Sequence, residues 1–314
     1  MALPTLRDVR PVDPVLTNLS IGFKNEKFLW DKIAPPSEQA QKSGTFFLYT
    51  RDYWFRRQTG GKRAEDGSYT RVGYGVSSDT YKCEERGFEK LLDDPTRAAS
   101  QTPEDLQVMD VQFLTNLIQL ELEKDVAAAC FVTDVWGTTA TLTGTDQWSD
   151  YDGSDPIAKI DLAKRTILRG TGARANVLFL GLLAWEKLKE HPLLLDKYKH
   201  TQKGILDEAL VAAALGIDEV IVGTSVENTA AEGQTFVPGD MWTDNALILV
   251  RNNPGLGVAN GAYTFIWNER GNVPWAIESY RDEAKRGEVS RVFTHYVPKI
   301  VSSAHGYIFL DCVA

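Results

Sequence analysis

The four histidines are the first residues to test for chemistry, because imidazole nitrogens bind zinc and move protons near neutral pH. They are His191, His200, His295 and His305, and no two of them are separated by one or three residues. Zinc ligands that share one helix or hairpin need such short spacings. The pattern therefore predicts surface or packed histidines and no metal site.

A short acidic segment, Asp150–Gly153, has the composition of part of a calcium loop. Aligning Gly153 with the invariant glycine of such a loop places Trp148 at the first ligand position and Lys159 at the last. Calcium needs oxygen ligands at both positions, so we expect a polar turn. The Gly255-Leu256-Gly257 segment lacks the third glycine and the βαβ context of a dinucleotide fingerprint.

Signals for nucleophilic catalysis are also missing from the sequence. The three cysteines, Cys83, Cys130 and Cys312, form no CxxC pair and no even-numbered framework, so reduced thiols are expected. No GxSxG or GxxxxGK[ST] motif occurs. We predict that the protein is not an enzyme and carries no cofactor. The alternative is an α/β enzyme that uses the loops around residues 223–245 and a hairpin lid.

Charge is unevenly distributed along the 314 residues, whose formal net charge is −9. Residues 51–71 carry six basic and three acidic side chains, which gives +3. Residues 103–125 carry six acidic side chains and one basic one, which gives −5. The basic residues are Arg51, Arg56, Arg57, Lys62, Arg63 and Arg71, and the acidic ones are Glu104, Asp105, Asp110, Glu121, Glu123 and Asp125.

Two interpretations of this charge pattern are open. In the first, both segments are ordinary solvated faces. In the second, the basic segment of one copy lies across the acidic segment of a neighbouring copy. In the second case complementary charge would set the register and the rate of association. The negative net charge makes the whole chain a poor general binder of nucleic acid.

Two segments have no means of burying themselves. Residues 1–44 contain five prolines and one short amphipathic piece at 16–33, which predicts an extended arm. Residues 45–90 alternate aromatic, β-branched and charged positions around a glycine-bounded tip at 60–67, which predicts a long two-stranded hairpin. An isolated hairpin is marginal in water, so both segments need a partner surface.

A long helix is predicted over 103–129. Thr102 is a good N-cap and Pro103 suits the first helical position. Apolar residues then recur at spacings of three and four, which is the period of a helix face. One stripe comprises Leu106, Met109, Phe113, Leu117 and Leu120, and a second comprises Val111, Leu114, Ile118 and Leu122.

From residue 156 the pattern changes to short helices that alternate with continuous apolar runs, which are typical of strands covered on both faces. Helices are predicted at 156–170, 182–190 and 204–215, with Gly170 and Gly216 ending the first and the last. Strands are predicted at 177–180, 219–222, 246–250, 263–267, 276–280, 289–297 and 307–310. A membrane-spanning helix needs a run of about 18 apolar residues. The sequence contains no run of that length.

Three stretches and the order of the elements carry a resemblance to a known family. The stretches are Leu16–Ser20 with Phe28–Pro35, Pro156–Pro192, and Leu210–Asn228. The order is an arm, a long hairpin, a long helix, an α/β block and closing strands. Together they resemble the tailed-bacteriophage major capsid proteins, which have the Hong Kong 97-like fold. The resemblance covers nearly the whole chain and includes no catalytic motif.

The resemblance implies an α+β capsid fold with five parts. Residues 1–44 would be the N-terminal arm, 45–90 the E-loop hairpin, 91–150 the P domain with its spine helix, 151–270 the α/β A domain, and 271–314 the return strands of the P domain. It also implies a homo-oligomer of hexamers and pentamers that closes into an icosahedral shell around double-stranded DNA. Because the net charge of the chain is negative, we expect the DNA to be enclosed without sequence-specific binding.

The same resemblance implies partners and a location. Separate scaffold, portal and decoration proteins are expected partners, and the chain would be made in the host cytoplasm and end in the virion. An encapsulin-type compartment, which shares the fold but houses enzymes, is the second interpretation. The proline-broken start favours a phage arm over a cargo-binding N-terminal helix.

Overall fold

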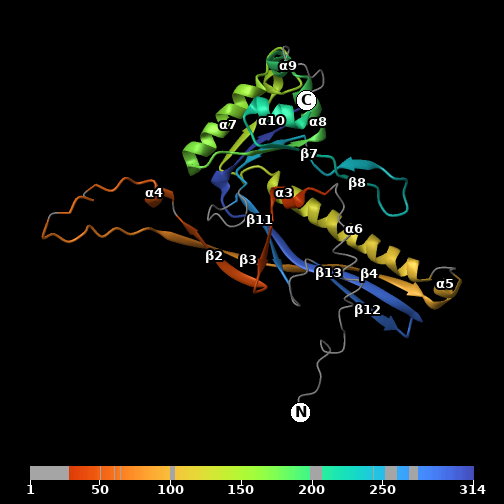
Figure 1. Cartoon of the computed structure of the whole chain (residues 1–314). Helices are drawn as coiled ribbons and strands as arrows, with labels where there is room; N and C mark the ends of the chain where they lie inside the picture. The colour runs from red at the N-terminus through yellow and green to blue at the C-terminus, as the bar shows by residue number, and fades with distance from the viewer. Residues whose placement is uncertain are drawn as a thin grey trace.

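The structure is a computed structural model that describes residues 28–49, 51–59, 61–63, 65–99, 103–198, 207–242, 244–251, 260–268 and 275–314. Two five-stranded sheets with their helices form the body, and a long loop projects from it (Figure 1). The predicted mixture of helices and strands is confirmed. Of the arm predicted over 1–44, residues 1–27 lie outside the described part.

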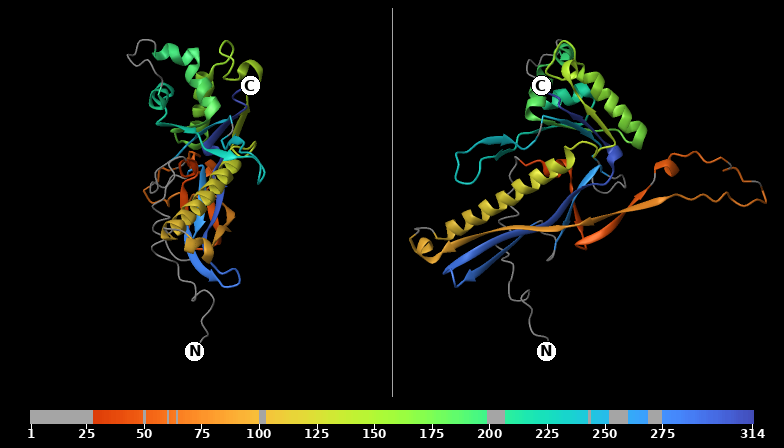
Figure 2. Two further views of the ribbon diagram at one scale, coloured as in Figure 1. Left: turned by 90° about the vertical axis from the view of Figure 1, so that its right-hand side faces the viewer. Right: turned by 180° about the vertical axis from the view of Figure 1, so that it is seen from behind.

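The first sheet is built on the long strand β13 (Gly287–Ile300). Three strands pair antiparallel with β13, and one further strand is added at the edge. The antiparallel partners are β4 (Glu84–Asp93), β12 (Ala276–Asp282) and β11 (Ala262–Trp267), and β1 (Pro36–Gln39) pairs parallel with β11. The helix α5 (Asp94–Ala99) follows β4, and α6 (Pro103–Cys130) runs along this sheet (Figure 2).

The helix predicted over 103–129 is confirmed as α6, and the structure shows which stripe faces the core. The second stripe, Val111 to Leu122, is buried and continues to Val126. In the first stripe, Met109 is 62% exposed and Phe113 is 52% exposed. Both stripes have helical spacing, so the sequence could not say which one meets β4 and β13.

The second sheet has the strand order β5-β14-β10-β6-β7 and is covered on both faces. Its strands are β5 (Thr138–Thr141), β14 (Gly306–Leu310), β10 (Ala246–Leu249), β6 (Val177–Gly181) and β7 (Glu219–Gly223). Four helices gather around it: α7 (Pro156–Thr171), α8 (Leu182–Glu190), α9 (Pro192–Tyr198) and α10 (Glu208–Leu215). Short 3-10 turns at Gly144–Asp146 and Ser303–His305 complete this part.

The helix ends follow the capping residues of the sequence, with one difference. The Asp155 carboxylate accepts a hydrogen bond from the Ala158 N–H at 2.9 Å and caps α7. This helix ends at Gly172, which has a left-handed backbone (φ 71°), and not at Gly170. Two nearby glycines could serve as the cap, and spacing alone does not choose between them. Gly216 ends α10 as predicted (φ 62°).

Membership of the sheets differs from the predicted boundaries at several strands, among them β11 and β14. β11 falls within the predicted unit 151–270, yet it pairs with β13 in the first sheet. β14 falls within the predicted return segment 271–314, yet it lies between β5 and β10 in the second sheet. Both are continuous apolar runs that suit a buried strand in either sheet, so sequence pattern does not distinguish the two positions.

The predicted hairpin of 45–90 has shorter paired strands and a longer connecting loop than the sequence suggested. β2 (Ser43–Tyr49) pairs with β3 (Val76–Lys82), and the short helix α4 (Arg51–Trp54) opens the segment between them. Residues 84–90 belong to β4 of the first sheet. The projecting segment of residues 51–75 is called the basic loop below (Figure 1). A small hairpin, β8 (Val226–Asn228) with β9 (Pro238–Asp240), projects from the opposite flank in both views.

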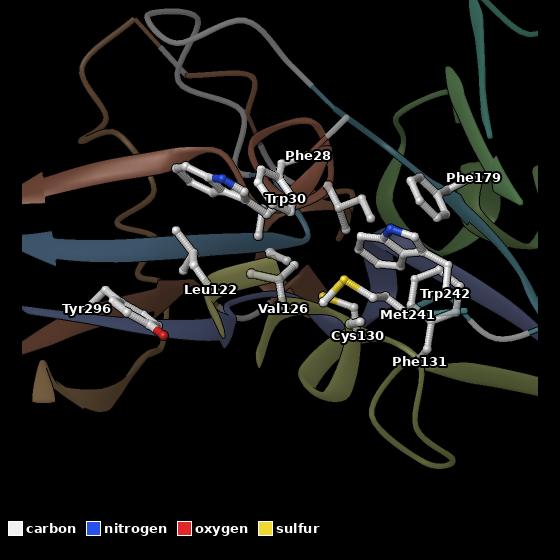
Figure 3. Packing of buried hydrophobic residues seen from close by; sticks show 14 of the residues in the cluster. Phe28, Trp30, Leu122, Val126, Cys130, Phe131, Phe179, Met241, Trp242 and Tyr296 are labelled. Carbon is white, nitrogen blue, oxygen red and sulfur yellow. The ribbon is translucent and has the colours of Figure 1, made fainter. Parts of the chain in front are cut away.

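The end of the predicted arm does find cover on its own body. The helix α3 (Trp30–Ile33) packs against α6, and Phe28, Trp30, Ile33 and Ala34 belong to the main core (Figure 3). The expectation that residues 1–44 form one uncovered arm is therefore wrong for residues 28–34. The cause is a buried acid on α6.

That acid is Glu123, whose side chain is fully buried. Its carboxylate accepts hydrogen bonds from the backbone N–H groups of Leu29 (2.8 Å) and Trp30 (2.7 Å). It also accepts from the Ser225 hydroxyl and from Nε1 of Trp242, both at 2.9 Å. Burial raises the pKa of Glu123, and these four donors oppose that rise. One carboxylate thus joins the N-terminal segment, α6 and the segment between β7 and β10.

We predict that Glu123→Ala lowers the free energy of unfolding by about 3–5 kcal/mol, because four buried donors lose their acceptor. Urea denaturation followed by circular dichroism measures this change. Glu121→Ala is the matched control, since the partly exposed Glu121 pairs with Arg86 and such a pair contributes about 1 kcal/mol or less. Equal losses in the two variants would contradict the role of Glu123.

Candidate intersubunit surface

The basic loop exposes a set of large apolar side chains that its own body does not cover. Nine of them in and beside the loop are between 44% and 74% exposed. They are Phe47, Tyr49, Tyr53, Trp54, Phe55, Tyr69, Val72, Tyr74 and Val76. Soluble monomers rarely display a contiguous apolar patch of this kind, and such patches mark sites of interaction.

Contacts within the loop hold its shape without burying it. Tyr49, Trp54 and Tyr74 form a three-ring cluster with centroid separations of 5.9 to 6.0 Å. Two of the predicted basic residues also lie against rings: the Arg56 guanidinium is 5.8 Å from the Tyr53 ring, and that of Arg63 is 5.2 Å from the Tyr69 ring. Offset ring contacts of this kind contribute about 0.5–1.5 kcal/mol each.

All six basic residues predicted as a contact set are exposed on this loop: Arg51, Arg56, Arg57, Lys62, Arg63 and Arg71. The base of the loop touches the end of α7, where Nη1 of Arg51 donates to the Gly170 carbonyl at 3.3 Å. A groove of about 640 Å³ lies between them and is called the basic groove below. It is lined by Arg51, Asp52, Phe55, Arg56, Arg169 and Gly170.

The acids predicted on α6 are partnered within the chain wherever the structure describes their side chains. Asp110 pairs with Lys90. Glu121 and Asp125 both pair with Arg86, at 2.7 and 3.2 Å. Tyr296 also donates to Asp125 at 2.9 Å, and burial is the largest cause of the raised pKa of Tyr296. Glu123 is enclosed as described above.

These pairings change what the helix offers to a neighbour. The four described acids of α6 already have cationic or hydrogen-bonding partners on β4, β13 and the N-terminal segment. The side chains of Glu104 and Asp105 lie outside the described part of the chain. A contact between a neighbour's loop and this helix therefore stays a prediction.

The structure shows a second acidic element, which lies outside the two segments whose charges were counted in the sequence. Residues 224–245 carry Glu227, Glu232, Asp240 and Asp244 and no lysine, arginine or histidine. This segment contains β8 and β9, and we call it the acidic hairpin. Lys124 of α6 pairs with Glu227 at 2.7 Å and fastens its base. The signal was visible in the sequence, which instead suggested pocket-forming loops there.

The apolar residues of the acidic hairpin are exposed as well. Val226 is 46% exposed, Phe236 is 62% and Val237 is 50%. Asn228 stabilises the turn, since its Oδ1 accepts from the N–H groups of Ala230 (3.1 Å) and Val237 (3.0 Å). The hairpin is thus an ordered projection with apolar and acidic side chains together.

One arrangement resembles a catalytic pair and is structural. Nε2 of His191 lies 3.0 Å from the Ser154 hydroxyl, and both residues are buried. Nδ1 of His191 accepts from the Leu193 N–H at 3.3 Å, which leaves the proton on Nε2. His191 then donates to Ser154, whose hydroxyl donates to the Asp150 carbonyl at 2.5 Å. A general base would have to accept from the serine, so this pair fixes a turn.

The cysteines are all buried, and burial raises the pKa of Cys83 to about 11 and that of Cys130 to about 12. Such thiols are poor nucleophiles at neutral pH. Among the residues that the structure describes, no group of three or more histidine, cysteine or acidic side chains is arranged to hold a metal ion. Within that same part of the chain, no helix is both long and apolar enough to span a bilayer.

Sequence comparisons identify relatives of this chain. Residues 123–263 match the family described as Phage major capsid protein E. A relative named major capsid protein, from Burkholderia phage BcepMu, is 27% identical over 96% of this chain and 97% of its own length. Another of the same name, from Pseudomonas phage JBD67, is 25% identical over 97% and 98%.

Solved structures show the same fold. A phage-related protein from Bordetella bronchiseptica aligns with a TM-score of 0.76 at 22% identity, covering 96% of this chain and 98% of that one. An encapsulin complex from Synechococcus elongatus aligns with a TM-score of 0.53 at 9% identity, covering 100% and 92%. The fold of this chain, two sheets with a long helix and a projecting loop, is thus shared with a phage-related protein and with an encapsulin.

Two relatives that align over nearly the whole chain are both named major capsid protein of a phage. Together with the family match over residues 123–263, they support a tailed-phage major capsid protein family for this chain. The resemblance stated from element order is confirmed, and the family's name points to a structural role.

Acidification is predicted to destabilise the subunit through two histidines, the buried His191 and the partly buried His305. Burial lowers the pKa of His191 and of His305. A base whose pKa is lower in the folded state gives full stability above its unfolded pKa of about 6.5, and that stability is lost as the pH falls through this value. The free energy of unfolding, measured in urea, should therefore be smaller at about pH 5.5 than at about pH 7.5.

His191→Gln isolates the contribution of one histidine, since glutamine does not titrate. This variant should be less stable than the parent at the higher pH, because a buried hydrogen bond is disturbed, but should lose less on acidification. An unchanged pH dependence in the variant would show that His191 does not contribute.

Proposed function

We propose that this major capsid protein self-assembles, through hexamers and pentamers, into an icosahedral shell that encloses double-stranded DNA. The observation that carries the proposal is the basic loop, which projects from the body (Figure 1). Its aromatic side chains are exposed to solvent. Neighbouring copies of the chain supply the surface that covers it.

The gain from such cover is large enough to drive assembly. Burying one large apolar side chain completely is worth about 1.5–3 kcal/mol, and nine are more than two-fifths exposed. Association of large bodies costs roughly 4–15 kcal/mol in lost freedom of motion. Each copy in a closed shell has a neighbour on both flanks, so apolar side chains are buried at every contact between copies.

The charge of the chain supports a container that does not bind its contents tightly. The net charge is −9, and the basic loop is net +3 over residues 51–71. Phosphate binding scales with the number of basic side chains that neutralise the backbone. We infer that DNA is enclosed without sequence-specific contacts, and that scaffold, portal and decoration proteins are separate partners. The chain would be made in the host cytoplasm and reside in the virion.

In this proposal the parts of the body take the roles known for the fold. The basic loop with β2 and β3 is the E-loop, α6 with the first sheet is the P domain, and the second sheet with its helices is the A domain. On the basis of strand pairing we place β4 and β11 in the P domain and β5 and β14 in the A domain, which departs from the boundaries at residues 90, 151 and 271.

Electron microscopy of the expressed protein tests the proposal directly. Closed particles that package DNA in the presence of the phage's other head proteins are expected. Particles that instead co-purify with a cargo enzyme and without DNA would favour an encapsulin-type compartment. A stable monomer across salt and crowding conditions would rule out both kinds of shell.

Arg57→Glu is predicted to impair assembly far more than folding. Arg57 is exposed on the basic loop, so the free energy of unfolding should change by less than about 0.5 kcal/mol. Reversing its charge at a complementary interface should lower the assembled fraction roughly tenfold or more, measured by sedimentation. Arg165→Glu on the exposed side of α7 is the matched control, and an equal loss of assembly in that variant would contradict a specific role for the loop.

A further inference from the structure

We propose that the acidic hairpin of one copy docks in the basic groove of the next copy. The inference rests on the proposed assembly. It names the element of the neighbouring copy that contacts the base of the basic loop. Three observations carry it: the chemistry of the groove, the chemistry of the hairpin, and their positions on opposite flanks.

The basic groove offers cationic and apolar surface together. Arg51, Arg56 and Arg169 line it against a single acid, Asp52, which gives a local excess of two positive charges. Phe55 forms its apolar wall and is 62% exposed. A ring and several guanidinium groups at one place suit a ligand that presents an apolar side chain next to carboxylates.

The acidic hairpin presents that combination. Phe236 and Val237 are half or more exposed, and Glu232 lies exposed in the connecting turn. No basic side chain occurs between residues 224 and 245 to neutralise the acids from within. Lys124 pairs with Glu227. This ion pair lies at the base of the hairpin and not at its tip.

Placement on the body excludes contact within one copy and favours a head-to-tail contact between copies. The basic loop and the acidic hairpin project from opposite flanks, as Figures 1 and 2 both show. A contact between two unlike surfaces of identical subunits is heterologous and generates a ring when the rotation closes. Pairing like with like would set acid against acid or arginine against arginine, which costs free energy.

Paired cysteines test the contact without removing its chemistry. Gln234→Cys lies in the turn of the hairpin and keeps Phe236, and Asp52→Cys lies in the groove and keeps its three arginines. Both parent residues are exposed, whereas the three native cysteines are buried. Assembled particles of the double variant are treated with a short bismaleimide and separated on a denaturing gel.

A ladder of covalent multimers, extending from dimers to closed rings, is the expected result. Each single variant should give no ladder, because a heterologous contact needs both cysteines. Gln234→Cys combined with Glu186→Cys, an exposed position on α8, is the matched control and should stay largely monomeric.

Three other outcomes overturn the inference. Intact particles of the double variant without a ladder would show that the groove receives another element, while the shell function stands. Dimers from Gln234→Cys alone would show an isologous contact between hairpins. If the parent protein forms no particle at all, the proposed function fails, and the docking contact falls with it.

Discussion

The body of this capsid protein depends on one buried carboxylate. Glu123 lies in the C-terminal third of the long helix and is fully buried, so an uncompensated charge there would cost several kcal/mol. Four donors from three parts of the chain enclose it: two backbone N–H groups at residues 29 and 30, the Ser225 hydroxyl and the Trp242 indole. The requirement to satisfy this group fixes how the N-terminal segment, α6 and the segment between β7 and β10 meet. It also fixes the direction from which the chain enters the body.

Ion pairing inside the subunit decides which charges remain for contact between subunits. Arg86 and Lys90 of β4 neutralise Glu121, Asp125 and Asp110 of α6. The surplus positive charge of the basic loop and the surplus negative charge of the acidic hairpin are then left on opposite flanks. Partly exposed pairs such as these contribute little to stability. Their larger effect is to remove competing attractions, so that an arriving copy meets one strongly charged feature on each side.

Features written in local sequence were predictable, and features that depend on sheet pairing were not. The helix at 103–130, the buried strands of the second sheet and the glycine that ends α10 follow from capping residues and apolar periodicity. The exposure of the basic loop follows from its composition, because nothing near it in sequence could cover it. In contrast, the partners of the α6 acids lie on β4, and their proximity depends on how β4 pairs with β13.

The same limit explains why Met109 and Phe113 were not recognised as exposed and why residues 28–34 were assigned to a free arm. Two stripes of α6 have equal apolar character, and the choice between them is made by the position of the first sheet. The hydrogen bonds that retain Leu29 and Trp30 come from Glu123, 93 and 94 residues further along the chain. A contact at that separation leaves no periodic trace in either segment.

The position of β14 has a consequence for the timing of synthesis. Residues 306–310 form an interior strand of the second sheet, with β5 and β10 on either side. The sheet stays divided until residues 306–310 have left the ribosome, and its closing contacts join segments far apart in sequence, which slows folding. A nascent chain that still lacks this strand therefore cannot present a finished flank to other copies.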